Sequence, residues 1–81
     1  MGILRVMFRR GDERITWDQQ KAAVGDAEAL AAIREAERLF AEARRRGATA
    51  FEIDTSQPSR RIEGFDWKAE QIVLIPRVMG G

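Results

Sequence analysis

The sequence predicts a single α+β domain in which one long helix packs on a four- to five-stranded mixed sheet. Apolar residues alternate in two short segments near the N-terminus. They recur at three- and four-residue steps over residues 26–46, and they run without a break over residues 72–75. The chain has 81 residues, of which 44% are hydrophobic and 33% are charged. This length and balance are typical of one globular domain with a single core layer.

Residues 3–8 and 13–17 are expected to form an N-terminal β-hairpin, because both segments are rich in strand formers. Residues 9–12, Arg-Arg-Gly-Asp, have turn chemistry, and Gly11 is free to adopt a positive φ. The side chains that alternate onto one face are Leu4, Val6 and Phe8 in the first strand, and Ile15 and Trp17 in the second.

The helix is predicted to begin at Asp26 and to end near Arg46, after a connector at residues 18–25 that holds at most one loose turn. Asp26 is a suitable N-cap, and Gly47 is a suitable residue to follow the last turn. The apolar stripe consists of Leu30, Ile33, Ala36, Leu39, Phe40 and Ala43, and the water-facing side consists of Arg34, Glu35, Arg38, Glu42 and Arg45.

Three extended segments follow the helix. Residues 48–54 alternate as a strand, residues 55–59 predict a turn or loop, and residues 61–65 predict a short edge strand. In the last strand, at residues 70–75, the apolar side chains are continuous rather than alternating. This pattern favours a central strand covered on both faces, or one covered by the core on one side and by a partner on the other.

The element order is therefore strand, strand, helix, strand, short strand, strand. If the first and last strands pair side by side in parallel, the intervening chain is long enough to make the crossover. That arrangement is the ubiquitin-like β-grasp. We expect the β-grasp domain to span residues 1–76 and a flexible tail to span residues 77–81.

Several residue types that carry chemistry are missing from the sequence. It has no cysteine, no histidine and no tyrosine, which removes thiolate and imidazole metal ligands and the commonest general base. The carboxylate pairs Asp12 with Glu13 and Glu63 with Asp66 are interpreted as solvated surface charge. We therefore expect no catalytic residue, no metal and no bound cofactor.

The charge balance argues against nucleic-acid and membrane partners. The net charge is +1, although arginines cluster at residues 9–10, 44–46 and 60–61. No apolar run approaches the roughly 18 to 20 residues that span a bilayer, and no signal peptide is apparent. A cytoplasmic location is expected.

Trp17 and Trp67 are interpreted as residues of the core or its edge, and Trp67 is the better candidate to contact a partner.

The end of the chain, residues 70–81, reads Glu-Gln-Ile-Val-Leu-Ile-Pro-Arg-Val-Met-Gly-Gly. This segment resembles the ubiquitin-like proteins that end in diglycine, particularly the prokaryotic sulfur carriers of thiamine and molybdopterin synthesis. Those proteins end in an acidic residue, a short apolar strand, a proline, a small apolar group and Gly-Gly. The matching places here are held by Glu70, Ile72 to Ile75, Pro76, Val78, Gly80 and Gly81.

The chain also departs from the sulfur carriers. Arg77 stands where they often have a second proline, and Met79 stands where they have serine or alanine. Residues 47–54 and 60–70 look more like bacterial ubiquitin-like modifiers that work with their own activating enzymes in conjugation operons. The resemblance therefore favours a protein modifier over a sulfur carrier.

The resemblance implies a function for the tail. An E1-like adenylating enzyme of the ThiF family would use ATP to convert the Gly81 carboxylate into an acyl-adenylate, which is then conjugated to protein targets. An E2-like conjugating enzyme and a deconjugating protease are further possible partners. Glycine allows close approach of the enzyme, and proline ends the strand. The residues expected to contact the activating enzyme are Pro76, Arg77, Val78, Met79 and Gly80.

Two alternatives stay open. In a sulfur carrier, the same carboxylate becomes a thiocarboxylate. In a non-covalent β-grasp assembly module, such as a phage-tail assembly factor, the tail has no covalent fate.

Only two of the fourteen basic residues are lysines, Lys21 and Lys68. A lysine amine captures an activated carboxylate once it is deprotonated, whereas arginine stays charged. Lys21, Lys68 and the N-terminal amine are therefore the candidate sites for chain linkage. A genome that favours arginine codons would produce the same excess of arginine over lysine.

Overall fold

The alternating segments near the N-terminus form a β-hairpin, as predicted. Strand β1 (Gly2–Phe8) pairs antiparallel with strand β2 (Gly11–Trp17). The computed structural model describes residues 1–8 and 11–77. The predicted turn residues 9 and 10 lie outside the described residues.

The hairpin differs from the prediction at its tip. Strand β2 begins at Gly11 rather than at residue 13, because Gly11 and Asp12 continue the pairing with the last residues of β1. Gly11 has a φ of +147°, a conformation that favours glycine. Phe8 shares a face with buried residues of β1, yet it is 47% exposed because it borders a groove at the end of the hairpin.

Two helices follow the hairpin. The predicted loose turn is a short helix, α1 (Gln19–Ala23), whose first backbone N–H groups are capped by the Asp18 carboxylate. The long helix α2 (Ala27–Arg45) is capped by Asp26, as predicted, through a 3.0 Å hydrogen bond from the backbone three residues later. Gly47 follows the last turn, as predicted, and it takes a φ of +94°.

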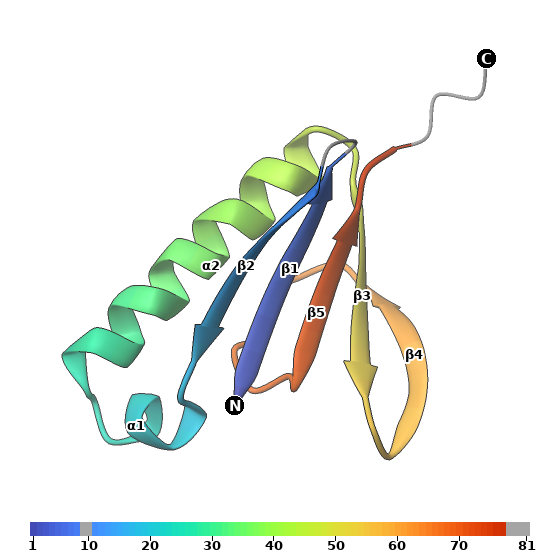
Figure 1. Ribbon diagram of the computed structural model, residues 1–81. Coiled ribbons are helices and arrows are strands. Elements are labelled where there is room, and N and C mark those ends of the chain that lie inside the picture. The colour runs from blue at the N-terminus through green and yellow to red at the C-terminus, as the bar shows by residue number, and fades with distance from the viewer. Residues whose placement is uncertain (9–10, 78–81) are drawn as a thin grey trace.

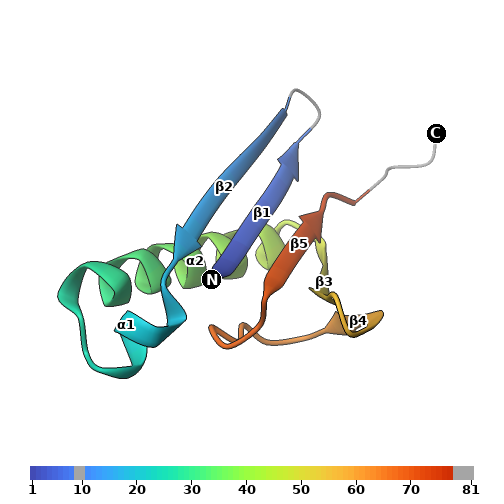
Figure 2. The ribbon, with the colours of Figure 1, turned by 60° about the horizontal axis from the view of Figure 1, so that its bottom comes forward.

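The remaining strands are β3 (Thr49–Asp54), β4 (Gln57–Ile62) and β5 (Gln71–Ile75). They complete one five-stranded mixed sheet with the order β2-β1-β5-β3-β4, in which β1 and β5 are parallel and the other pairs are antiparallel. Figures 1 and 2 show α2 lying across one face of this sheet. The last strand is therefore central, and it pairs in parallel with the first.

The prediction for the chain around β4 is wrong in detail. A strand occupies most of the predicted loop at residues 55–59, and it ends before the predicted strand at residues 61–65 is complete. Asp54 closes the β3–β4 turn by accepting hydrogen bonds from the backbone N–H and hydroxyl of Ser56, and these bonds lower the pKa of the Asp54 carboxyl. Pro58 is tolerated because β4 is an edge strand.

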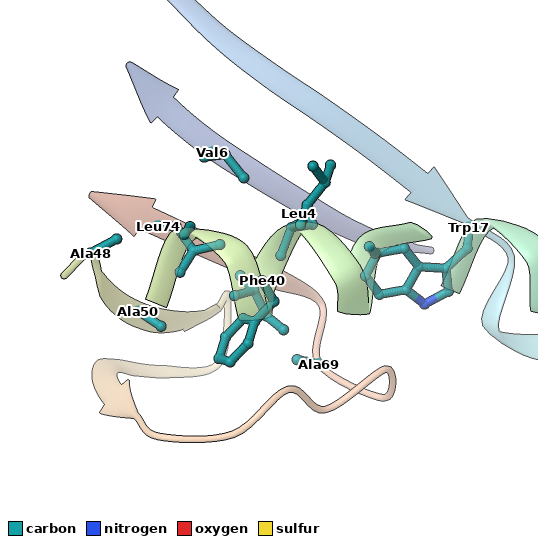
Figure 3. Packing of buried hydrophobic residues seen from close by; sticks show 12 residues of the cluster. Leu4, Val6, Trp17, Phe40, Ala48, Ala50, Ala69 and Leu74 are labelled. Atoms are coloured by element: carbon teal, nitrogen blue, oxygen red, sulfur yellow. The ribbon is translucent and has the colours of Figure 1, made fainter. Parts of the chain in front are cut away.

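The core lies between α2 and the covered face of the sheet. Phe65 turns into it, with its ring centroid 5.7 Å from that of Trp17 and 5.8 Å from that of Phe40. Trp17 is buried and Trp67 is half-buried at the core edge, as expected for both. The buried cluster, shown in part in Figure 3, consists of Leu4, Val6, Trp17, Ala36, Leu39, Phe40, Ala43, Ala48, Ala50, Ala69, Ile72 and Leu74.

The two faces of the sheet differ. Ile72 and Leu74 of β5 are fully buried beneath α2, whereas Val73 points to the other face and is 8% exposed. In β3 the small Ala50 faces the helix, and the larger Phe51 lies beside Val73 on the opposite face. The described residues place no second layer over that face, so β5 is covered by the core on one side only (Figure 2).

Candidate functional site at the C-terminal end of the sheet

The chain leaves the sheet at the end of its central strand. Ile75 is the last residue of β5 and pairs with Thr49 of β3. Pro76 follows and is exposed, and it has no backbone N–H with which to extend the pairing. Arg77 is the last described residue, and it too is exposed. The predicted tail contacts Val78, Met79 and Gly80, and the attachment residue Gly81, lie outside the described residues.

Arg77 lies against the turn that ends α2. A Cβ atom added to Gly47 would be 3.4 Å from Cδ and 3.6 Å from Cβ of Arg77. The aliphatic part of the arginine side chain therefore passes over a position where no side chain projects. This contact links the first tail residue to the C-terminal end of the helix.

Replacing Gly47 with alanine should lower the free energy of unfolding by about 1 to 2 kcal/mol, because alanine is strained at positive φ. Urea denaturation measures this loss. Gly25→Ala is the matched control, since Gly25 has a φ of +84° and open space around its Cα. The added Cβ at Gly47 would make ordinary van der Waals contact with Arg77, so we expect Gly47→Ala to cost no more than Gly25→Ala. A clearly larger loss at Gly47 would mean that the Arg77 side chain is displaced.

A groove of about 700 Å³ lies beside the point where the chain leaves the sheet. It is bordered by the end of β1, the part of α2 that follows Glu37, and the start of the tail. The groove is lined by apolar side chains, by four charged side chains of the hairpin and the helix end, and by Arg77. The lining residues are Val6, Met7, Phe8, Glu13, Arg38, Leu39, Glu42, Ala43, Arg46, Ala48, Pro76 and Arg77.

The helix side of this groove carries a chain of ion pairs. Glu42 accepts hydrogen bonds from Arg38 at 3.2 Å and from Arg46 at 2.9 Å, and Arg38 also pairs with Glu35. The hydrogen bond from Arg38 lowers the pKa of the Glu35 carboxyl, and the same bond raises the pKa of Arg38. Exposed pairs of this kind contribute little to stability, so a partner can exchange them at low cost.

The uncovered face of the sheet is a second candidate contact surface. Because side chains alternate along a strand, residues next to the buried positions of β1, β3 and β5 share this face. The apolar ones are Ile3, Met7, Phe51, Ile53, Val73 and Ile75. Arginines flank them: Arg5 is the neighbour of Val73 on β1, and Arg61 is the neighbour of Phe51 on β4. We call this surface the open sheet face.

At the other end of the sheet, Gln19 ties α1 to the segment before β5. Its side-chain amide donates to the carbonyl oxygens of residues 67–69 at 3.3, 2.9 and 2.9 Å. The indole N–H of Trp17 donates to the Trp67 carbonyl at 2.9 Å. These bonds satisfy three backbone acceptors in a segment that belongs to neither a helix nor a strand.

Both candidate linkage lysines lie at this Gln19-tied end. Lys21 is in α1, two residues after Gln19, and Lys68 is in the segment that Gln19 binds. Both side chains are exposed, and Nζ of Lys68 lies 5.9 Å from the centre of the Trp67 ring. Neither lysine borders the groove that contains Arg77.

One carboxylate of each pair that the sequence contains forms an ion pair with an arginine. Asp12 pairs with Arg5 at 3.2 Å, and Glu63 pairs with Arg44 at 2.6 Å. Within residues 1–8 and 11–77, no group of three or more acidic residues is placed to hold a metal ion.

Neither of the helices in these residues is both long and apolar enough to cross a membrane.

Sequence patterns gave no sign of the groove or of the Gln19 contacts. Phe8 was expected to continue the buried face of β1, and only its place beyond the covered part of the sheet makes it a groove residue. Arg38 and Glu42 were interpreted only as part of the water-facing side of the helix. No protein-family model, curated protein or solved structure matches the chain.

Proposed function

We propose that the protein is a ubiquitin-like β-grasp modifier whose Gly81 carboxylate is adenylated by a dedicated activating enzyme and transferred to protein targets. One observation carries the proposal. The central strand β5 pairs in parallel with β1 and leads through Pro76 directly into a tail that ends in Gly-Gly. The sheet order and the single long helix across one face are the arrangement that we expect of a β-grasp.

The fold supplies a rigid base for the tail. Ile72 and Leu74 fix β5 in the core, and Arg77 rests against Gly47 at the end of α2. Gly80 and Gly81 have no Cβ atoms, so an enzyme's backbone and an incoming nucleophile can approach the carboxylate closely. The protein itself contributes position and access, and the activating enzyme contributes ATP and the catalytic groups.

The proposed chemistry has two steps. A carboxylate oxygen of Gly81 attacks the α-phosphorus of ATP and pyrophosphate leaves, which forms an acyl-adenylate. The amine of a target, or first a thiol of the enzyme, then attacks the carbonyl carbon and AMP leaves. The groove beside Pro76 and the open sheet face are the surfaces on which we expect the activating enzyme to dock. Both lie next to β5, from which the tail continues.

The test is to express the protein with an N-terminal tag in its native host and to purify it under denaturing conditions. We expect conjugates of higher mass. Because trypsin cleaves after Arg77, each acceptor lysine should carry a Val-Met-Gly-Gly branch rather than Gly-Gly alone. Removal of Gly80 and Gly81 should abolish the conjugates. Gly81→Ala should reduce their rate of formation at least about tenfold, a barrier increase of about 1.4 kcal/mol. Gly64→Ala, at an open position, is the control.

Other outcomes identify the alternatives. An intact mass in which one oxygen of the Gly81 carboxylate is replaced by sulfur indicates a sulfur carrier. Full activity of the protein without Gly80 and Gly81 indicates an assembly module. An intact mass that places residues after Gly81 in the mature protein contradicts all readings in which Gly81 is activated directly.

A further inference from the structure

The groove at the end of the sheet has an apolar wall that the described residues leave uncovered. Phe8 lies on the face of β1 that carries the buried Leu4 and Val6, yet it is 47% exposed. Leu39 and Ala43 form the apolar part of the helix side of the groove. A side chain that continues a core face normally has a cover, and exposed apolar surface of this kind marks a contact site. The groove therefore has the chemistry to hold an apolar segment.

The segment nearest to this groove is the end of the chain itself. Pro76 and Arg77 both line the groove. In the parallel register of β1 with β5, Val6 lies beside Leu74, so two residues further along both strands Phe8 is level with the start of the tail. The end of β1, the end of β5 and the C-terminal end of α2 lie at the same end of the molecule (Figure 1).

The four residues that follow Arg77 match the groove in composition and in length. They are Val-Met-Gly-Gly, which supplies two apolar side chains, two residues without a side chain and a carboxylate. Fully extended, they span at most about 14 Å. The helix side of the groove runs from Arg46 back to Arg38, which is about 12 Å along the helix axis. Every part of the groove is therefore within reach of these four residues.

Charge favours one end of the groove for the terminal carboxylate. Arg38 already pairs with Glu35 and Glu42, and Glu13 also lines the groove. Another carboxylate would be repelled there. Arg46 donates to Glu42 at 2.9 Å, and its side chain is 71% exposed. A guanidinium has five N–H donors, so Arg46 can bind a second carboxylate while it keeps the first.

We propose that residues 78–81 lie in the groove of their own chain in the free protein. The two apolar side chains cover Phe8, the two glycines let the chain turn, and the terminal carboxylate accepts hydrogen bonds from Arg46. Burial of the two side chains is offset by the entropy lost when four residues are ordered, so the closed arrangement is only slightly more stable than the open one. A partner that binds the groove displaces the tail.

The consequence for activation rests on the proposed function. While the Gly81 carboxylate lies in the groove, it is not extended towards the nucleotide of an activating enzyme. An enzyme that docks in the groove takes the place of the tail, so docking and release of the carboxylate become one event. Because exposed ion pairs exchange at low cost, the carboxylate leaves Arg46 with little loss.

The test uses the full chain without any enzyme, so its failure leaves the proposed function standing. The protein is labelled with ¹⁵N throughout and with ¹³C in the methionine and valine methyl groups, and NMR measures backbone order parameters and nuclear Overhauser contacts. We expect contacts from the Met79 methyl group to the Phe8 ring. Order parameters at residues 78 and 79 should lie above about 0.6, the value below which a backbone is flexible.

Two substitutions with matched controls sharpen the result. Arg46→Glu replaces the donor with a like charge, and Arg45→Glu changes the net charge equally at a position that does not line the groove. Phe8→Ala removes the apolar wall, and Ile75→Ala removes a side chain that is 41% exposed on the open sheet face. We expect the order parameters at residues 78 and 79 to fall below about 0.6 in Arg46→Glu and Phe8→Ala, and to stay unchanged in both controls. The amide shifts of β5 report whether each variant is folded.

Three results would overturn the inference. The first is a wild-type protein whose order parameters at residues 78 and 79 lie below about 0.6. The second is a set of Met79 contacts that lie outside the groove, or that appear only between labelled and unlabelled copies in an equal mixture, because the tail then lies elsewhere or in a second copy. The third is an equal effect of Arg46→Glu and Arg45→Glu, which contradicts the place assigned to the carboxylate.

Discussion

Replacement of Leu74 with alanine is expected to cause the largest loss of stability of any single substitution considered for this fold, about 2 to 5 kcal/mol. Leu74 is fully buried beneath α2, between Val6 of β1 and Ala50 of β3. Removing its side chain loses transfer energy and leaves a cavity. A domain of 81 residues has a total stability of about 4 to 12 kcal/mol, so the variant should be close to unfolded at 37 °C.

Equilibrium denaturation in urea, followed by circular dichroism, measures this effect. Ile75→Ala is the matched control, because Ile75 is the next residue of β5 and is 41% exposed on the open sheet face. We expect the control to lose less than about 1 kcal/mol, as a surface position does. If both substitutions lower the midpoint equally, the assignment of Leu74 to the covered face of the sheet is wrong.

The second large effect is expected at Gly2. A Cβ atom there would lie 2.2 Å from Cε2 and 2.3 Å from Nε1 of Trp17, its cross-strand partner. The indole is 3% exposed, and its N–H is committed to the Trp67 carbonyl at 2.9 Å. The ring therefore has to move and weaken this hydrogen bond, or the two strands have to separate. Gly2→Ala should lose about 1 to 3 kcal/mol, as overpacking of a core does.

Thermal unfolding tests this expectation, and a shift of about 4 to 8 °C is expected for each kcal/mol lost. The near-ultraviolet circular dichroism of the tryptophans should change in the same variant. Gly64→Ala is again the control, since nothing lies within 4 Å of its added Cβ, and it should stay within about 0.5 kcal/mol of the wild type. A Gly2→Ala protein that melts with the control would show that Trp17 does not pack over β1.

The sequence was a good guide wherever local physical chemistry decides the structure. The 3.6-residue period, the Asp26 cap and the place of Gly47 after the last turn are properties of a few neighbouring residues, and all three predictions are confirmed. The continuous apolar run of β5 predicted a central strand, and the sheet order confirms this place. The run also predicted that a second layer or a partner covers the other face of the strand, and the described residues place no layer there.

The chain around β4 was harder to predict because its conformation depends on position in the sheet. Proline normally argues against a strand, yet Pro58 is accommodated at an edge where one row of N–H groups has no partner strand. Phe65 looked like part of a strand, but it fills the space between Trp17 and Phe40 instead. The connector was predicted to hold at most one loose turn, although it contains a helix N-cap residue. That residue is Asp18, and it caps α1.

By itself, the sequence determined the inventory: one long helix, an apolar last strand, a diglycine ending, twelve arginines and two lysines. It also limited the chemistry, because the residue types that it lacks are the commonest catalytic and metal-binding ones. Only the tertiary structure decided where these parts lie relative to one another. Parallel pairing of β1 with β5 places Lys21 and Lys68 at one end and Arg77 at the other, and this separation depends on contacts between residues far apart in the chain.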